Sequence, residues 1–230
     1  MTADLLDKAA PAGQAPLTDR AYAAIRDRIL RDAAGGRLKL DTLQKELGFS
    51  SSPLREALNR LVAEGLVTAD GRRGFHVAPV NLDDLADITA MRMVTEPGAF
   101  AAAVERGDDA WEAQIVASFH RLHLVERRIE QMQAARDDHW TEAHRAFHLA
   151  LIAACGSRRL IGACAQLFDQ SERYRRLSAS FRRRPRDTSD EHRRLMEAAL
   201  ARSVEAPALL RAHIASTAAH ISEAVRGRGA

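Results

Sequence analysis

The region from Leu82 onward most constrains the fold, because its apolar residues recur at the spacing of amphipathic helices and no alternating strand pattern interrupts them. We predict helices over residues 82–105, 109–134, 138–155, 158–180, 189–203 and 206–225. Alanine, leucine, arginine and glutamate are abundant and aromatic residues make up 5%, which favours helices over sheets. Residues 82–226 are therefore expected to form an all-α bundle of six to seven helices.

The composition is that of a globular protein, with 46% hydrophobic and 28% charged residues in a chain of 230. Because the net charge is only +3, any affinity for nucleic acid must come from local clustering of basic residues. Residues 1–16 lack the pattern of a signal peptide and are expected to be a flexible tail. No apolar run is long enough to cross a bilayer, so we expect a cytoplasmic protein without a membrane partner.

Residues 17–79 have a different pattern, with short helices followed by a β-branched stretch punctuated by glycine. Tyr22, Ile25 and Ile29 mark a first helix, and a second begins near Asp41 and ends at Gly48. Ser52 and Pro53 suit the N-cap and first position of a third helix, whose predicted buried face is Leu54, Ala57, Leu58, Leu61 and Val62.

The segment "LVTADGRRGFHVAP" then predicts two short strands around a tip that carries glycine and arginine. Three short helices followed by a β-hairpin describe a winged helix-turn-helix over residues 17–79. Pro79 and Asn81 suit a linker and a helix start, which places the boundary between the two domains at residues 79–82. The fold class is therefore mainly α, with a winged helix-turn-helix followed by a helical bundle.

The stretches "LGFSSSPLREALNRLVAEGLV" and "RRGFHV" resemble the DNA-binding domain of the GntR family of bacterial transcription regulators. The resemblance implies that the third helix enters the major groove of an operator and that the wing touches the minor groove. The DNA-binding residues it implies, together with the exposed face of that helix, are Ser50, Ser51, Ser52, Arg55, Asn59, Arg72, Arg73 and Gly74. Ser51 departs from the family, which often has arginine there. The alternative for the three arginines is ordinary solvated surface charge.

Two histidines, His144 and His148, lie one helical turn apart on an apolar helix face that continues through Leu151, Ile152 and Cys155. Residues at this spacing share a face, so both imidazoles can bind one ion. In "TSDEH", Thr188 and Glu191 predict a capping box that places His192 in the first turn of a helix. The simpler alternative is that these are core histidines bonded to backbone or carboxylate groups.

The motifs "AFHLALIAACGSRRL", "DEHRRLMEAAL" and "LLRAHI" resemble the FCD domain of the FadR subfamily of GntR regulators. The resemblance implies a divalent metal bound by His148, His192 and His213, with a fourth ligand four residues before the first. The family usually has Asp or Asn at that position, whereas this chain has His144. Four nitrogen ligands suit Zn²⁺ best and allow Ni²⁺ or Cu²⁺, in preference to Mg²⁺ or Ca²⁺.

Arg92 and Glu96 are also one turn apart, in the first predicted helix of the bundle. The default interpretation of such residues is an i, i+4 ion pair. In the FCD family the corresponding arginine often meets a carboxylate of the bound effector, so the resemblance implies that these two residues recognise a small organic acid. The segment "RYRRLSASFRRRPR" holds seven further arginines and is expected to be a solvated helix end and loop.

Together these features predict a bacterial, ligand-responsive transcription regulator that binds an operator as a homodimer and is not an enzyme. One alternative is a metal sensor without an organic effector. Another is a helical-bundle metalloenzyme in which the histidines activate water. The chain lacks the Glu-x-x-His and His-Glu-x-x-His patterns of such enzymes, and four protein ligands would leave little room for substrate.

Overall fold

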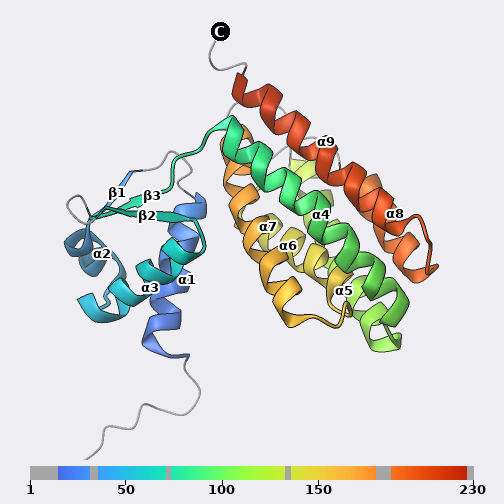
Figure 1. Cartoon of the computed structure of the whole chain (residues 1–230), viewed down its shortest axis with the longest axis horizontal. Coiled ribbons are helices and arrows are strands. Elements are labelled where there is room, and N and C mark those ends of the chain that lie inside the picture. Colours follow the sequence, from blue (N-terminus) through green and yellow to red (C-terminus); the bar gives the residue numbers. More distant parts are fainter. Residues whose placement is uncertain (1–14, 32–35, 71–73, 133–135, 180–187, 227–230) are drawn as a thin grey trace, which may run out of the picture. The chain divides into compact units, whose positions relative to one another are not determined.

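The computed structural model describes residues 15–31, 36–70, 74–132, 136–179 and 188–226 (Figure 1). The contacts between residues divide the chain into two compact units, with a boundary between Ala78 and Pro79. The described residues are mainly helical, and the strands among them belong to the first unit.

The first unit contains α1 (Leu17–Arg31), α2 (Leu40–Leu47) and α3 (Ser51–Ala63), with a small antiparallel sheet. Strands β2 (Val67–Asp70) and β3 (Gly74–Val77) form the predicted hairpin. A third strand, β1 (Arg37–Leu38), pairs with β3 on its other side and gives the order β1-β3-β2. The predicted hairpin is confirmed, and β1 is an additional strand that was not predicted, because two residues are too few to show an alternating pattern.

The turn between α2 and α3 is made by Gly48, whose φ of 72° lies in the left-handed region and whose N–H donates to the carbonyl of Gln44. Helix α3 begins at Ser51 with Ser50 as its N-cap, so the prediction of Ser52 as N-cap was wrong. Pro53 is the third residue of the helix and not the first, as predicted, and it is tolerated there because the first backbone N–H groups of a helix have no intrahelical partner.

Helix α3 packs on a core formed by all elements of the unit, with side chains that are nearly inaccessible to water: Ile25, Ile29, Leu38, Leu43, Leu54, Leu58, Leu61 and Leu66. Polar contacts at the edge of this core join α3 to α1. Arg60 Nη1 lies 2.6 Å from Asp19 Oδ1, and the Tyr22 hydroxyl donates to Glu64 Oε2 at 2.7 Å. Because Arg60 also covers the Tyr22 ring, it supports the packing of the two helices.

The second unit is a bundle of α4 (Leu82–Arg106), α5 (Asp109–Met132), α6 (Asp138–Ile152), α7 (Arg158–Ala179), α8 (Ser189–Leu200) and α9 (Ala206–Arg226). Helix α4 packs on α9 and α7, and α5 packs on α6 and α8 (Figure 1). The predicted fold class is confirmed: a helix-turn-helix unit is followed by a helical domain. Two helices are shorter than predicted, since α6 and α8 close in turns near Gly156 and Arg202, which both have positive φ.

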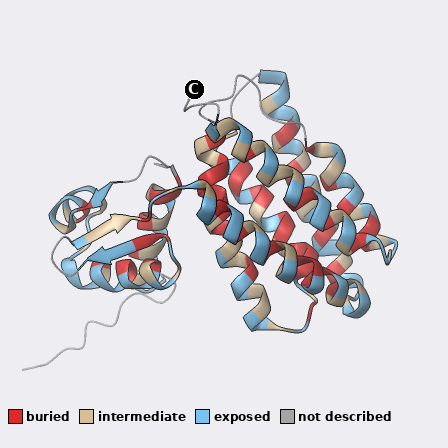
Figure 2. Ribbon diagram, turned by 45° about the horizontal axis from the view of Figure 1, so that its top comes forward, coloured by how far each residue is buried: buried red, intermediate tan, exposed pale blue. Residues whose placement is uncertain are grey.

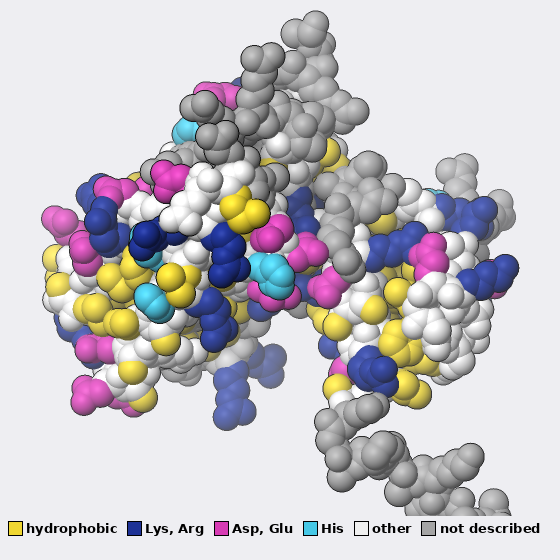
Figure 3. All heavy atoms as spheres, turned by 180° about the vertical axis from the view of Figure 1, so that it is seen from behind, with side chains coloured by type: hydrophobic (Ala, Val, Ile, Leu, Met, Phe, Trp, Pro, Cys, Tyr) yellow, Lys and Arg dark blue, Asp and Glu magenta, His cyan; other side chains and the backbone are white. Residues whose placement is uncertain are grey.

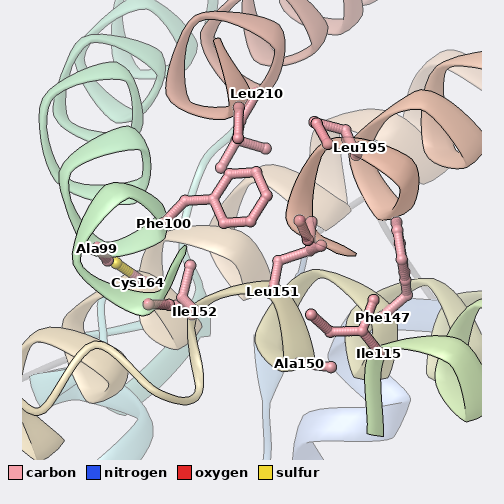
Figure 4. Packing of buried hydrophobic residues seen from close by; sticks show 14 of the residues in the cluster. Ala99, Phe100, Ile115, Phe147, Ala150, Leu151, Ile152, Cys164, Leu195 and Leu210 are labelled. Carbon is pink, nitrogen blue, oxygen red and sulfur yellow. The ribbon is translucent and has the colours of Figure 1, made fainter. Parts of the chain in front are cut away.

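The bundle core gathers side chains from all six of its helices, as Figure 4 shows for Phe100, Ile115, Leu151, Leu195 and Leu210, among others. The buried residues follow the inward faces of the helices, and the exposed residues cover their outer faces (Figure 2). On the face seen in Figure 3, Arg side chains lie beside Asp and Glu side chains over the bundle. This mixture fits a chain whose net charge is small.

The arginines of α7 are less solvated than predicted. Arg173 and Arg175 are only 3% and 8% exposed. Arg175 Nε donates to Glu172 at 2.7 Å, and its guanidinium lies 4.1 Å from the centre of the Trp140 ring. The prediction of a solvated helix end was wrong for these residues, because a carboxylate and an aromatic face are present to receive the cations. Arg176, the other described arginine of that segment, has its Nη1 2.8 Å from Asp138 Oδ1, and the remaining four arginines lie outside the described residues.

Candidate functional site

Four histidines from three helices meet inside the bundle. His144 and His148 lie on α6, His192 on α8 and His213 on α9. All four are buried, and each offers one ring nitrogen such that these four atoms lie within 4.8 Å of one another. Sequence spacing placed the first pair on one face of a helix, and the packing of α8 and α9 adds the other two.

The rings are arranged around a common centre and are not stacked as a column. The ring centroids of His144 and His148 are 4.5 Å apart, and those of His148 and His213 are 5.1 Å apart. The ring centroid of His192 is 5.1 Å from the ring centroids of both His144 and His213. The adjacent Trp140 stacks on the outer side of this group, with its ring centroid 4.2 Å from that of His144.

Several of these ring nitrogens have no hydrogen-bond partner among the described residues. They are Nδ1 of His144 and both nitrogens of His148 and of His192. A buried polar atom without a partner costs free energy, so such atoms are rare unless they bind something. The residues present therefore fit a metal ion: the donor set is four imidazoles, which divalent transition metals accept.

The imidazoles are held in the form that binds metals. Burial lowers the pKa of His144 and of His148 well below the ordinary value for an imidazole, and the neighbouring histidines lower it further. Burial also lowers the pKa of His213 to about 4, although its hydrogen bond with Glu191 acts in the opposite direction. These rings are neutral at neutral pH, and a neutral ring has a lone pair available for coordination.

Two carboxylates that the sequence analysis did not assign to this site contact the ligand histidines from outside. Glu191 Oε2 on α8 lies 2.7 Å from His213 Nδ1, and Glu126 Oε1 on α5 lies 3.3 Å from His192 Nδ1. Burial raises the pKa of Glu126, but its interactions with His192 and Ser189 outweigh this effect and lower the pKa below the ordinary value. The sequence carried no signal for Glu126, because its helix is remote in sequence from α8.

The predicted capping box is not formed, although α8 does begin after Thr188. The Thr188 side chain makes no cap hydrogen bond to the helix; instead its hydroxyl accepts from Arg136 Nη2 at 3.0 Å. Glu191 faces His213, and this contact takes its carboxylate away from the helix N-terminus. The prediction was wrong because tertiary partners compete with the local capping hydrogen bonds.

A small cavity adjoins the histidines. It is lined by His144, His148, His213, Arg92 and Arg175, among others, and about 20 Å³ of it is open to a water-sized sphere. That volume holds about one water molecule.

Arg92 and Glu96 form a buried ion pair beside this cavity. Arg92 Nε donates to Glu96 Oε1 at 2.5 Å, and Arg92 Nη1 donates to Ser171 Oγ at 2.8 Å. Arg92 and Glu96 therefore form the i, i+4 ion pair that is the default interpretation of their spacing. Effector binding by the two residues stays a prediction. Arg92 lines the same cavity as His144, His148 and His213.

The predicted DNA-binding residues lie on the surface of the first unit. Ser50, Ser51, Ser52, Arg55 and Asn59 are exposed at the start and along the outer face of α3. Gly74, with a φ of 80°, begins β3 at the wing. Arg72 and Arg73 lie outside the described residues.

A groove of about 320 Å³ joins these elements and is lined by Arg55 and Gly74 together with Arg37 and Lys39. The sequence analysis missed Arg37 and Lys39, because β1 was not predicted. The sequence signal that could have identified them is that Arg37 and Lys39 directly follow a pair of glycines in the same unit as Arg55. A groove with three cations beside the third helix suits a nucleic-acid backbone.

Two protein-family models match the chain. Residues 17–77 match the bacterial regulatory proteins of the gntR family, and residues 87–216 match the FCD domain. The chain belongs to the GntR family. It is a DNA-binding transcription regulator with an FCD domain.

Curated relatives of this GntR regulator are also transcription regulators. The chain is 43% identical over 188 residues to the regulator BphR of Paraburkholderia xenovorans, a match that covers 81% of this chain and 77% of BphR. It is 35% identical over 198 residues to the transcriptional repressor GlaR of Escherichia coli, covering 83% of this chain and 88% of GlaR. Since the family and these relatives are regulators, the metalloenzyme interpretation is set aside.

Solved structures share the fold of this GntR regulator. Escherichia coli McbR/YncC matches with a TM-score of 0.73 at 21% identity, over 94% of this chain and all of that chain (100%). A GntR regulator from Rhodococcus sp. RHA1 matches with a TM-score of 0.72 at 20% identity, over 90% of this chain and 97% of that chain. Among the helices that the structure describes, none has both the length and the apolar character needed to cross a bilayer.

Proposed function

We propose that the helical domain binds one divalent transition metal through His144, His148, His192 and His213 and regulates operator binding in response to a small carboxylate. The observation that carries this proposal is the meeting of four buried imidazole nitrogens within 4.8 Å of one another. Several of these nitrogens have no hydrogen-bond partner among the described residues, which supports a role as ligands over a role as core side chains.

The bound ion would tie α6, α8 and α9 together, because its ligands come from all three helices. Metal binding favours the folded state, in which the four ligands are assembled, over the unfolded chain, in which they are dispersed. The ion would supply a positive centre for an anionic effector. Zn²⁺ is the first candidate for four nitrogen ligands, followed by Ni²⁺ and Cu²⁺.

Arg92 is the group of this chain proposed to recognise the effector carboxylate. It lines the same cavity as the histidines, and a guanidinium can bind a carboxylate through two parallel hydrogen bonds. Glu96 now occupies that fork, so an effector carboxylate would have to replace Glu96 on at least one N–H group. Because the cavity holds about one water molecule, effector binding also requires the surrounding helices to move.

The Arg92–Glu96 ion pair and the small size of the cavity favour a second candidate function, a metal sensor without an organic effector. Arg92 already has a carboxylate partner, and the cavity is small. In this version the ion itself is the signal, and Arg92 and Glu96 only stabilise the bundle.

One titration separates the two candidates. The change in operator binding is measured with metal-free protein, after addition of Zn²⁺ alone, and after Zn²⁺ together with a panel of small mono- and dicarboxylates. A response to the carboxylate that requires Zn²⁺ and is lost in Arg92→Lys supports the effector proposal. A full response to Zn²⁺ alone supports the metal sensor. If dialysed, metal-loaded protein retains no ion by elemental analysis, both candidates are wrong.

For DNA recognition, we propose that Ser50, Ser51, Ser52, Arg55 and Asn59 contact the operator and that two copies of the chain bind a pseudo-palindrome. The exposure of these residues on one face of α3 and the groove shared by Arg55, Arg37 and Lys39 support this assignment. Arg72, Arg73 and Gly74 complete the proposed surface at the wing. A footprint of the chain on its operator, with each half-site mutated in turn, tests the arrangement.

A further inference from the structure

A divalent ion held by the four histidines has no negative charge among its ligands. Among the described residues, the group of ligand atoms within 4.8 Å of one another contains four imidazoles and no carboxylate. The two arginines at the cavity do not change this balance, because Arg92 and Arg175 are each paired with a glutamate. Burying an uncompensated double positive charge is costly, so the compensation must lie in the next layer of residues.

Glu191 is one carboxylate in that layer. Its Oε2 is 2.7 Å from Nδ1 of His213, a hydrogen bond that makes Nδ1 the protonated nitrogen of the ring. The other ring nitrogen, Nε2, is then the one with a free lone pair. Glu191 lies on α8 and His213 on α9, so this contact also fixes the ring of one helix from its neighbour.

Glu126 is the other carboxylate, and it contacts His192 from α5. Its Oε1 lies 3.3 Å from Nδ1 of His192, which is within ion-pair distance but outside hydrogen-bond geometry. Both nitrogens of this buried ring are therefore without a hydrogen-bond partner among the described residues. Two further donors hold the carboxylate in place: Trp140 Nε1 at 3.3 Å from Oε1, and the Ser189 hydroxyl at 3.1 Å from Oε2. Glu126 is only 8% exposed, so its charge is poorly screened by water.

We propose that Glu126 and Glu191 are the positioning residues of the metal centre. Glu191 accepts a hydrogen bond from Nδ1 of His213, and Glu126 faces Nδ1 of His192 at 3.3 Å. In the metal-bound protein each carboxylate directs Nε2 of its ring to the ion and supplies one of the two negative charges that the ligands lack. This inference rests on the proposed metal site. A carboxylate behind a ligand imidazole raises the basicity of the ring and fixes its orientation, and removing such a partner lowers metal affinity about 10–100-fold.

The test compares Glu126→Gln and Glu191→Gln with two matched variants, Glu130→Gln on α5 and Glu197→Gln on α8, whose glutamates are exposed. Zn²⁺ affinity is measured on the full-length protein by competition with a chromophoric chelator. We expect each of the first two variants to lose about 10–100-fold in affinity and each control to bind like the wild type. Wild-type affinity in both Glu126→Gln and Glu191→Gln overturns the proposal.

A second readout separates positioning from a general structural role. In the Zn²⁺-bound wild type, nitrogen NMR should show His192 and His213 protonated at Nδ1 and coordinated through Nε2. Coordination of both rings through Nδ1 would overturn the proposal. The half-exposed Glu191 gives the clearest stability test: Glu191→Gln should lower the melting temperature of the Zn²⁺-bound protein and leave that of the metal-free protein unchanged. An equal loss in both forms assigns Glu191 to the fold and contradicts the proposal.

These outcomes are distinguishable from failure of the proposed function. If the wild type itself binds no Zn²⁺, the metal site is wrong and the carboxylates have nothing to position. If the wild type binds Zn²⁺ and the two glutamine variants bind it equally well, the site stands and only the role of Glu126 and Glu191 fails.

Discussion

The indole of Trp140 stacks on the imidazole of His144, with ring centroids 4.2 Å apart and an angle of 22° between the ring planes. The chain has two tryptophans, and the other is Trp111 on α5. Since coordination would withdraw electron density from the His144 ring, we expect Zn²⁺ to change Trp140 emission. A Zn²⁺ titration of Trp111→Phe should retain the change, and Trp140→Phe should lose it. An equal response in the two variants would place the ion elsewhere.

Changing His148 to alanine should abolish binding of the ion and lower thermal stability. His148 and His192 are the two candidate ligands whose ring nitrogens both lack a hydrogen-bond partner among the described residues, so replacing His148 breaks no hydrogen bond within that part of the chain. With free Zn²⁺ about a thousandfold above Kd, the ion stabilises the wild type by about 4 kcal/mol, and the variant should lose this contribution. Elemental analysis and melting curves measure both effects. His120→Ala, an exposed position on α5, is the control and should retain one ion per chain.

Arg55→Ala should weaken specific operator binding by about 1–3 kcal/mol, because an arginine on the exposed face of a recognition helix can read a base through two hydrogen bonds. The measurement is a gel-shift titration at fixed salt with the specific operator and an unrelated duplex. Arg127→Ala, an exposed position on α5 in the other unit, should bind both duplexes like the wild type. Unchanged affinity of Arg55→Ala for the operator would remove Arg55 from the reading surface.

The protein should be a homodimer in solution and should require two half-sites for tight binding. A single helix-turn-helix contacts few base pairs, and paired half-sites match the two-fold axis of a dimer. Light scattering coupled to gel filtration measures the mass, and operators with one half-site scrambled test the requirement. A monomer that binds one half-site as tightly as the full operator would contradict this expectation.

Stability should fall as the pH rises above about 9, in part because of Cys164. Burial raises the pKa of this thiol to about 11 from an ordinary value of 9.0, and the nearby Glu96 acts in the same direction. Because the folded state holds the proton more tightly than the unfolded state, the stabilisation is complete below pH 9.0 and is lost as the pH rises toward 11. Urea unfolding at several pH values should show a smaller decline in Cys164→Ala. An identical decline in the two proteins would assign it to other groups, such as Tyr174, whose pKa is also raised.

Much of the fold was accessible from the sequence because the periodic signals are long. Helix α4 was predicted within a residue at each end, despite Pro97 in its interior, since its apolar pattern spans many turns. The two residues of β1 carry no such signal, and β1 exists only because it pairs with β3. Arg37 and Lys39, which flank or lie in this strand, were missed for the same reason.

The residues of the candidate metal centre also differ in how far they could be predicted from the sequence. His144 and His148 could be paired from their spacing alone, whereas His192 and His213 needed the resemblance to a known domain. Glu126 could not be found by either route, because only the packing of α5 against α8 brings it to His192. Thr188 and Glu191 matched a local capping pattern, and their actual partners, Arg136 and His213, are set by tertiary contacts.

The order of the ligands along the chain has a consequence for protein synthesis. The DNA-reading unit ends at residue 78, and its core contains no residue beyond Val77. The four histidines follow between positions 144 and 213, so the last ligand emerges from the ribosome long after the reading unit. A nascent chain can therefore fold its reader before it is able to bind an ion. A product that stops short of α9 would keep the helix-turn-helix unit and lack His213, one of the four histidines of the candidate metal centre.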